Sequence, residues 1–457
     1  MTARERTPSS TRGADRWGAV VAVGITVFIT GADMTIVGVA LPTLGTDLGV
    51  GPTTVQWVVL GYALPLVALG LPLGRWADTM SKRQAFLLAV CGFGVASVLV
   101  AVADRLGTVV AARVMQGLFG ALISALVLAT IARSVRPQMM GRAVGVVAAL
   151  GPLGAAVGPA LGGALIEASG WRSVFLINVP ICFVAGWLGL RSIPADDMGL
   201  ALPRRSWLLD AILLGAGGTA FLLGLQAADP TRGTPILALS LLVLAIVVTA
   251  VWTRRPDARV ALGMLADPLP RYWLIASCCG GAVTGTLGFL APFHLTDGLR
   301  VSPTVAGLVL LALPAGMVAA APFGGMIGDR WGHHRAGVLG TALVLTGTVA
   351  LLGASGDWRA ADLAWRLALV GAGTGLLAGP CQAAVMNAVS PDRGATAGAF
   401  SSLTLNLGFA IGPPLGVLTW RMGGGSPADI PAGYTTAVVT AALSLLAVCM
   451  VVVSRRA

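Results

Sequence analysis

Two charged residues lie within otherwise apolar stretches of the chain, and their side chains are the first candidates for proton or ligand chemistry. Asp33 lies about 16 residues into the first apolar run, roughly 24 Å along a helix at about 1.5 Å per residue. Arg113 lies about six residues inside a later run. In lipid, a carboxylate must face water, pair or take up a proton, whereas a guanidinium keeps its charge and must find carboxylates, carbonyls or water.

Each residue also has a simpler interpretation. Asp33 could cap a helix or extend its side chain to the outer membrane interface, and Arg113 could reach the same interface because it is so close to the end of its run. Arg366 is a loose counterpart in the second half of the chain, and we expect it to be interfacial.

The elements that position these residues must be membrane helices. Of the 457 residues 56% are apolar and only 11% charged, and the mean hydropathy is +0.86. A soluble chain has about a quarter of its residues charged. The net charge of +11 falls in short runs between apolar stretches, which favours a membrane surface over nucleic acid as its partner. The six cysteines lie in apolar stretches without ligand spacing, so no disulfide framework or metal site is predicted.

Apolar runs of about 20 residues, the length that crosses the hydrocarbon, predict fourteen spans. Their approximate limits are 17–44, 52–74, 84–103, 107–132, 139–166, 172–190, 207–227, 234–252, 272–296, 303–327, 335–353, 362–389, 394–420 and 435–453. Between them, 22 of the 30 basic residues fall on the side of the termini and six on the other side. The positive-inside rule therefore predicts a multi-pass protein of the cell membrane with both termini in the cytoplasm.

The chain contains an internal repeat. A segment around Asp78 is matched by one around Asp329, 251 residues later, and Arg142 and Arg393 have the same separation. A Gly-x-x-x-Gly-Pro-x-x-Gly pattern that starts at Gly154 recurs 254 residues later. Three matches in one order predict two parallel six-helix halves, an arrangement typical of alternating-access transporters.

This repeat divides the chain into five parts. They are a disordered cytoplasmic arm (1–16), a first six-helix bundle (17–191), a cytoplasmic linker with two inserted helices (192–270), a second six-helix bundle (271–453) and a cytoplasmic tail (454–457).

The chain resembles the major facilitator superfamily, and within it the fourteen-span drug:proton antiporters. The segment from Asp33 to Pro42 is similar to the first-span signature of those exporters, in which the acid contributes to transport. One difference is Gly38, where the signature has Asn, so a polar contact is expected to be missing. The spacing of Arg113, Gln116 and the following glycines matches the fourth-span motif, whose arginine is linked to proton translocation. The resemblance makes Asp33 the candidate partner of Arg113.

Two further motifs carry the resemblance. The segments after the second and tenth spans resemble the gate loops of the superfamily, in which an Asp pairs across the halves; an ordinary positively charged loop is the alternative. Their candidate residues are Gly74, Asp78, Lys82, Arg83, Asp329 and Arg330. The fifth span is similar to the antiporter motif of proton-driven exporters, although a helix-packing face would explain the glycine spacing alone. Its candidate residues are Gly154, Gly158, Pro159, Gly162 and Gly163.

These features predict a transporter rather than an enzyme. The sequence has no Walker A pattern, HExxH or nucleophile elbow, so we expect an ion gradient, most simply of protons, to supply the energy without a cofactor. We expect a monomeric all-helical membrane protein that exports small amphiphilic or cationic drugs in exchange for protons. An exporter of one metabolite or self-made antibiotic stays open on the same motifs, and a channel or membrane receptor is a remote alternative.

Overall fold

The computed structural model describes residues 16–454 apart from 137–138, 196–198, 200–203, 229–233, 256–257, 259–262, 264, 354–357 and 388–393. Within these ranges the regular structure is helical, and 14 helical segments are long and apolar enough to cross a membrane. The fourteen predicted spans are therefore confirmed. The predicted arm lies outside the described residues except for Arg16, as does the tail except for Ser454.

The described part of the first half contains eight helices, of which α2 and α7 are short pieces that lead into spans. They are α1 (Trp17–Asp47), α2 (Pro52–Val55), α3 (Trp57–Asp78), α4 (Lys82–Ala101), α5 (Leu106–Ser134), α6 (Met140–Ser169), α7 (Ser173–Leu176) and α8 (Asn178–Ser192). Two further spans follow, α9 (Arg205–Ala227) and α10 (Pro235–Thr253).

The second half repeats this plan. Its helices are α12 (Pro268–Phe293) with a π-helical turn (His294–Gly298), α13 (Pro303–Leu310), α14 (Ala312–Trp331), α15 (His333–Leu352), α16 (Ala360–Asn387), α17 (Gly394–Met422) and α18 (Ile430–Ser454).

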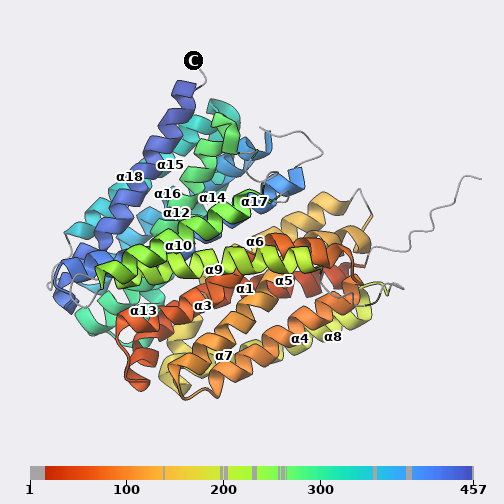
Figure 1. Ribbon diagram of the computed structural model, residues 1–457, viewed down its shortest axis with the longest axis horizontal. Helices are drawn as coiled ribbons and strands as arrows, with labels where there is room; N and C mark the ends of the chain where they lie inside the picture. The colour runs from red at the N-terminus through yellow and green to blue at the C-terminus, as the bar shows by residue number, and fades with distance from the viewer. Residues whose placement is uncertain are drawn as a thin grey trace, which may run out of the picture.

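Each half is a bundle, and the two bundles lie side by side with α9 and α10 across the seam (Figure 1). In the first bundle α1 packs on α6 and α5 packs on α3 and α4; in the second α12 packs on α17 and α16 packs on α14 and α15. The helix α9 contacts α3 from one half and α17 from the other. The inserted pair thus covers one side of the junction between the bundles.

The halves approach closely at the end of the bundles where α1 terminates, which we call the Asp47 end; the opposite end is the Trp17 end. A Cβ atom at Gly163 of α6 would lie 2.3 Å from the Pro303 carbonyl oxygen, and one at Gly307 of α13 would lie 2.2 Å from the Pro159 carbonyl oxygen. Arg421 Nη2 also donates a hydrogen bond to Thr53 Oγ1 at 2.9 Å. These contacts close the junction between the two halves at the Asp47 end.

Gly38 takes part in the same contact between the halves. A Cβ atom there would lie 2.8 Å from the Gly288 carbonyl oxygen of α12. Contacts under 3.0 Å are essentially never made by real Cβ atoms, so this approach has no room for the Asn of the family signature. The missing polar side chain is replaced by a tight contact between backbones.

The glycine stripe on α6 packs against α1. Cβ atoms at Gly154 and Gly158 would lie 2.0 Å from the Phe28 carbonyl oxygen and 2.3 Å from Thr35 Oγ1. Thr35 Oγ1 instead donates across this contact to the Ala155 carbonyl oxygen at 3.0 Å. Small residues thus hold α1 and α6 together as one unit.

The two gate segments differ from the predicted loops because helices continue through them. Gly74 and Asp78 belong to α3, which ends at Asp78, and Asp329 and Arg330 belong to α14, which ends at Trp331 before Gly332 with a φ of 90°. Neither segment contains a proline, so α3 continues to Asp78 and α14 to Trp331 before the chain turns. The side chains of Asp78 and Asp329 lie outside the described part, so their predicted pairing stays a prediction.

Lys82 and Ser81 have local roles in this segment. The Ser81 hydroxyl accepts from the Gln84 N–H at 3.4 Å as the N-cap of α4. The buried Lys82 ammonium donates to the carbonyl oxygens of Ala77 and Met80, at the C-terminal end of α3. Arg83 is half-buried on α4 and Arg330 is exposed. Lys82 thus stabilises the negative end of a helix dipole.

Gly158→Val should destabilise the protein, because the added side chain would overlap Thr35 and separate α1 from α6. We expect a loss of about 1–3 kcal/mol, typical of overpacking, measured as a lower unfolding midpoint of the purified protein in detergent. Gly107→Ala is the control, since a Cβ atom there meets no atom within 4 Å. An unchanged midpoint for Gly158→Val would contradict this account of the stripe.

Candidate functional site

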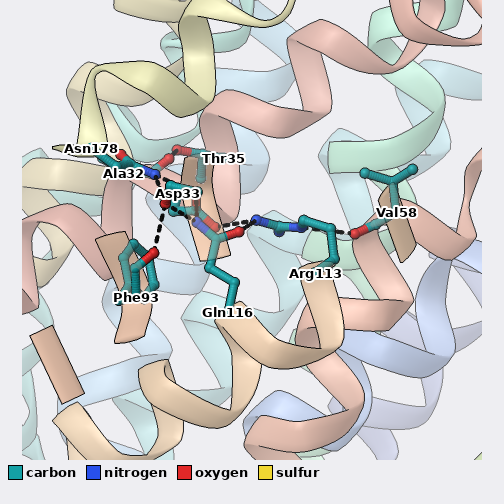
Figure 2. A network of polar contacts seen from close by, with 9 residues as sticks. Ala32, Asp33, Thr35, Val58, Phe93, Arg113, Gln116 and Asn178 are labelled. Carbon is teal, nitrogen blue, oxygen red and sulfur yellow. Dashed lines mark hydrogen bonds and ion pairs between the residues drawn. The ribbon is translucent and has the colours of Figure 1, made fainter. Parts of the chain in front are cut away.

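A buried ion pair joins α1 to α5. Arg113 Nη1 lies 2.6 Å from Asp33 Oδ2, and the side chains are 2% and 0% exposed, respectively. Figure 2 shows both residues directed at one another with Gln116 beside them. Arg113 and Gln116 are three residues apart on α5, so one helix face presents both to Asp33.

Amide groups complete the shell around Asp33. Asp33 Oδ1 accepts hydrogen bonds from Gln116 Nε2 and Asn178 Nδ2, each at 3.1 Å. Both amides also donate to Ser97 Oγ, at 2.9 and 3.3 Å, and the Ser97 hydroxyl donates a hydrogen bond to the Phe93 carbonyl oxygen at 2.9 Å. Side chains from α4, α5 and α8 therefore converge on one carboxylate of α1.

Arg113 is held by an equally complete set of contacts. Besides Asp33 it donates to Gln116 Oε1 at 2.6 Å and to the Val58 carbonyl oxygen of α3 at 3.0 Å. Its guanidinium lies 4.4 Å from the centre of the Tyr62 ring. Desolvating two charges costs several kcal/mol per ion, and only good geometry with further hydrogen bonds offsets this cost. The carboxylate is consequently stable only while its partners stay in place.

A cavity of about 650 Å³ lies between the two halves. Thr30, Gly31, Met34, Thr35 and Gly38 of α1 line it, but Asp33 does not. The helical period explains this arrangement, because residues 31, 34, 35 and 38 share one face of α1 and residue 33 lies on another. The same helix thus presents the cavity wall on one face and the ion pair on the other.

Tyr62 separates the cavity from the pair. It lines the cavity, is 2% exposed and carries the Arg113 guanidinium over its ring. The lining residues that the structure describes include no charged side chain. The charge pair therefore lies behind the cavity wall and not within it.

The structure brings together Asp33, Arg113 and Gln116, which the sequence singled out, and pairs Asp33 with Arg113. It excludes the interfacial alternatives for both residues, because both are 1% exposed inside the first bundle. Asn178 and Ser97 were missed. Asn178 had a signal, an amide inside the apolar run 172–190, whereas nothing in the sequence distinguished Ser97 from any other small polar residue.

At Arg366 the second half has a longer and more exposed ion pair, in which Arg366 Nη1 lies 3.8 Å from Asp362 Oδ1 and the Asp362 side chain is 42% exposed. That guanidinium donates to the carbonyl oxygens of Ala350 and Asp362 and lies 3.8 Å from the centre of the Trp358 ring. Its side chain is 17% exposed. Within the described ranges, no three His, Cys, Asp or Glu side chains gather in a way that could hold a metal ion.

Comparisons with known proteins agree with this architecture. The sequence profile of the Major Facilitator Superfamily matches residues 23–295 and 272–457. The chain is 27% identical over 404 residues to the riboflavin transporter RibZ of Clostridioides difficile, covering 87% of this chain and 86% of that protein. It is 31% identical over 404 residues to the drug efflux pump JefA of Mycobacterium tuberculosis, with coverage of 86% and 78%.

The fold is also similar to that of solved transporters. An inward-facing, unoccupied structure of a bacterial homologue of the human lysosomal transporter Spinster superimposes with a TM-score of 0.71 at 16% identity. The match covers 96% of this chain and 98% of that one. At this identity the likeness concerns the fold, which is the two-bundle arrangement expected from the internal repeat.

The ion pair predicts strong coupling between its two residues. Arg113→Met leaves the Asp33 carboxylate buried without its cation, and loss of one partner from a buried pair costs about 3–5 kcal/mol. The double variant Asp33→Asn/Arg113→Met should be more stable than the sum of the single effects implies, by about 0.5–3 kcal/mol. The free energies of unfolding of the wild type, the two single variants and the double variant are measured in mixed detergent micelles with increasing dodecyl sulfate. Additive single effects would show that the two charges do not depend on each other.

Proposed function

Because the chain belongs to the Major Facilitator Superfamily and is therefore a multi-pass membrane transporter of small molecules, we propose that it exports small amphiphilic or cationic compounds in exchange for protons. The observation that carries this proposal is the buried pair of Asp33 and Arg113. A guanidinium keeps its proton, so the carboxylate is the member of the pair whose charge a proton can remove.

Protonation of Asp33 changes what holds α1 against α5. The neutral acid loses its Coulomb attraction to Arg113, and one of its oxygens becomes a donor that faces N–H groups of Arg113, Gln116 or Asn178. Both changes weaken the contacts that join α1 to α5 and α8. The proton therefore favours a different position of α1.

The glycine contacts transmit this change to the cavity. α1 carries Asp33 on one face and cavity-lining residues on another, and it packs on α6 through Gly154 and Gly158. α6 in turn reaches the second half through Gly163 and Pro303. A shift of α1 thus alters both the cavity wall and the contact that closes the Asp47 end. Proton and substrate are then coupled as two ligands of the same conformational equilibrium.

We assign the Trp17 end to the cytoplasm, because 22 of the 30 basic residues flank the spans on that side. With this orientation the closed Asp47 end faces outward, and the cavity would load from the cytoplasm. The resemblance of α6 to the antiporter motif and the similarity to the pump JefA support export over uptake. We further propose that the transporter works as a monomer without cofactor or nucleic-acid partner, on the proton gradient alone.

A dedicated exporter of one metabolite is the second candidate function. The similarity to the riboflavin transporter RibZ favours it, since that relative is named for a single compound. Both candidates share the proposed proton step, and a substrate screen separates them.

Asp33→Asn should abolish proton-driven efflux while the protein remains folded, because the amide keeps the shape of the side chain but cannot change charge. The measurement is efflux of preloaded ethidium from cells, with and without an uncoupler, alongside gel filtration of the purified variant. Asp47→Asn is the matched control, because Asp47 lies on the same helix, is 46% exposed and pairs with exposed Arg172. Such a pair contributes about 0–1 kcal/mol.

Wild-type efflux that stops with the uncoupler, together with loss in Asp33→Asn and retention in Asp47→Asn, is the expected result. Uncoupler-sensitive efflux by Asp33→Asn at the wild-type rate would refute the assignment of Asp33. If the wild type exports neither ethidium, a permanent cation, nor the uncharged dye Nile red in the same assay, the dedicated exporter becomes the better candidate, and natural products of the host are the next substrates.

A further inference from the structure

The two walls of the central cavity differ in whether their polar side chains have hydrogen-bond partners. On the wall from the first half, the hydroxyls of Thr30 and Ser124 donate to carbonyl oxygens of their own helices, at 3.0 Å in both cases. The Tyr62 hydroxyl is the exception there, with no hydrogen-bond partner among the described residues. The first wall is otherwise apolar, with Val27, Met34 and similar side chains.

The wall from the second half presents polar groups that are not engaged. Ser401 of α17 is 5% exposed, lines the cavity, and its hydroxyl has no hydrogen-bond partner within the described ranges. Ser277 of α12, Gln382 of α16 and Asn406 of α17 also line the cavity, and their side chains make no hydrogen bond to any described residue. Thr284 on the same wall differs, since it donates to the Gly281 carbonyl oxygen at 2.8 Å.

These four free groups come from neighbouring helices, because α12 packs against both α17 and α16. Each can donate a hydrogen bond; Ser401 is buried, Ser277 and Asn406 are half-buried, and Gln382 is exposed. A buried donor such as the Ser401 hydroxyl costs free energy when it is left without a partner. All four lie in the parts of their helices nearer the Trp17 end: Ser277 and Ser401 are within ten residues of the starts of α12 and α17, and Gln382 is five residues from the end of α16. A bound molecule with an acceptor group would satisfy them.

A permanent cation finds no counter-charge in this cavity. The described lining residues carry no carboxylate, and Asp33 lies behind the wall with both oxygens occupied by Arg113, Gln116 and Asn178. Transfer of an unpaired charge into an apolar cavity is strongly unfavourable, whereas a neutral molecule loses only the hydrogen bonds that the wall replaces.

We propose that Gln382, Ser401, Asn406 and Ser277 form a binding subsite for the acceptor groups of uncharged, mainly apolar molecules, and that the cavity prefers these to cations. This inference rests on the proposed transport function and narrows its substrate class. The apolar body of the ligand packs against α1 and α3, and its carbonyl or similar acceptor faces the second half. The volume of about 650 Å³ lies within the range of cavities that hold drug-sized ligands.

Nile red and Nile blue test the charge preference, because they share one fused-ring skeleton and differ mainly in a carbonyl group against a cationic iminium. Binding to the purified full chain in detergent is measured from the concentration dependence of thermal stabilisation. We expect Nile red to bind at least about tenfold more tightly than Nile blue, a difference of about 1.4 kcal/mol. Equal affinities, tighter binding of Nile blue, or no binding of Nile red would overturn the proposal.

Variants of the subsite test the residues. Asn406→Leu and Gln382→Leu should each weaken Nile red binding by about three- to tenfold through loss of a hydrogen bond. Gln84→Leu, an exposed glutamine on α4, is the matched control and should bind as the wild type does. Unchanged Nile red affinity in both subsite variants would refute their assignment.

Asn406→Asp provides a test that does not depend on loss of binding. The substitution keeps the size of the side chain and places a carboxylate in the cavity, so at pH 8 it should shift the preference from Nile red toward Nile blue. A preference that does not change would count against the site.

The binding assay needs no proton gradient, so the two proposals can fail separately. Wild-type efflux that ignores the uncoupler would refute proton coupling and leave the subsite standing. The reverse result, coupled efflux with equal affinity for both dyes, would refute the subsite alone.

Discussion

An ionised carboxylate inside a membrane bundle needs a partner, and much of the first half is arranged to provide one for Asp33. The partner is Arg113, and amides from α5 and α8 with a hydroxyl from α4 satisfy the remaining lone pairs and N–H groups. Side chains of the four helices α1, α4, α5 and α8 thus contribute to one polar cluster. Because a half-satisfied cluster of this kind is worse than an apolar core, a change in the charge of Asp33 affects every helix that contributes.

The position of the pair determines how coupling works. Asp33 lies behind the cavity wall, so a proton and a substrate would not compete for one carboxylate. They would instead act on α1 from its two faces, and the backbone contacts with α6 and α12 would carry the movement to the second half. Separation of charge from cavity also frees the binding surface to select on shape and hydrogen bonding, which explains how an apolar cavity and a charged coupling site coexist in one bundle.

The sequence predicted the spans well because twenty-residue apolar runs leave little choice in lipid, and it predicted the two halves through repeated motifs. It also identified Asp33, Arg113 and Gln116, since charged and polar side chains are costly there. It missed Ser97 because a serine hydroxyl can bond its own helix anywhere. The gate segments were predicted as loops, whereas α3 and α14 extend to Asp78 and Trp331 and the chain turns only after these residues, because charge marks the side of the membrane but does not end a helix. The free groups on α16 and α17 depend on which helix faces meet, which one sequence does not reveal.

The most direct measurement for the central claim is infrared difference spectroscopy of the purified protein as the pH is lowered, with and without bound ligand. A proton on Asp33 produces a carboxylic acid carbonyl band that is absent from the ionised form. The account predicts that this band appears in the wild type, is missing in Asp33→Asn, and changes its midpoint when ligand binds the cavity. A wild-type spectrum identical to that of Asp33→Asn over the range in which transport occurs would contradict it, because Asp33 would then not be the group that carries the proton.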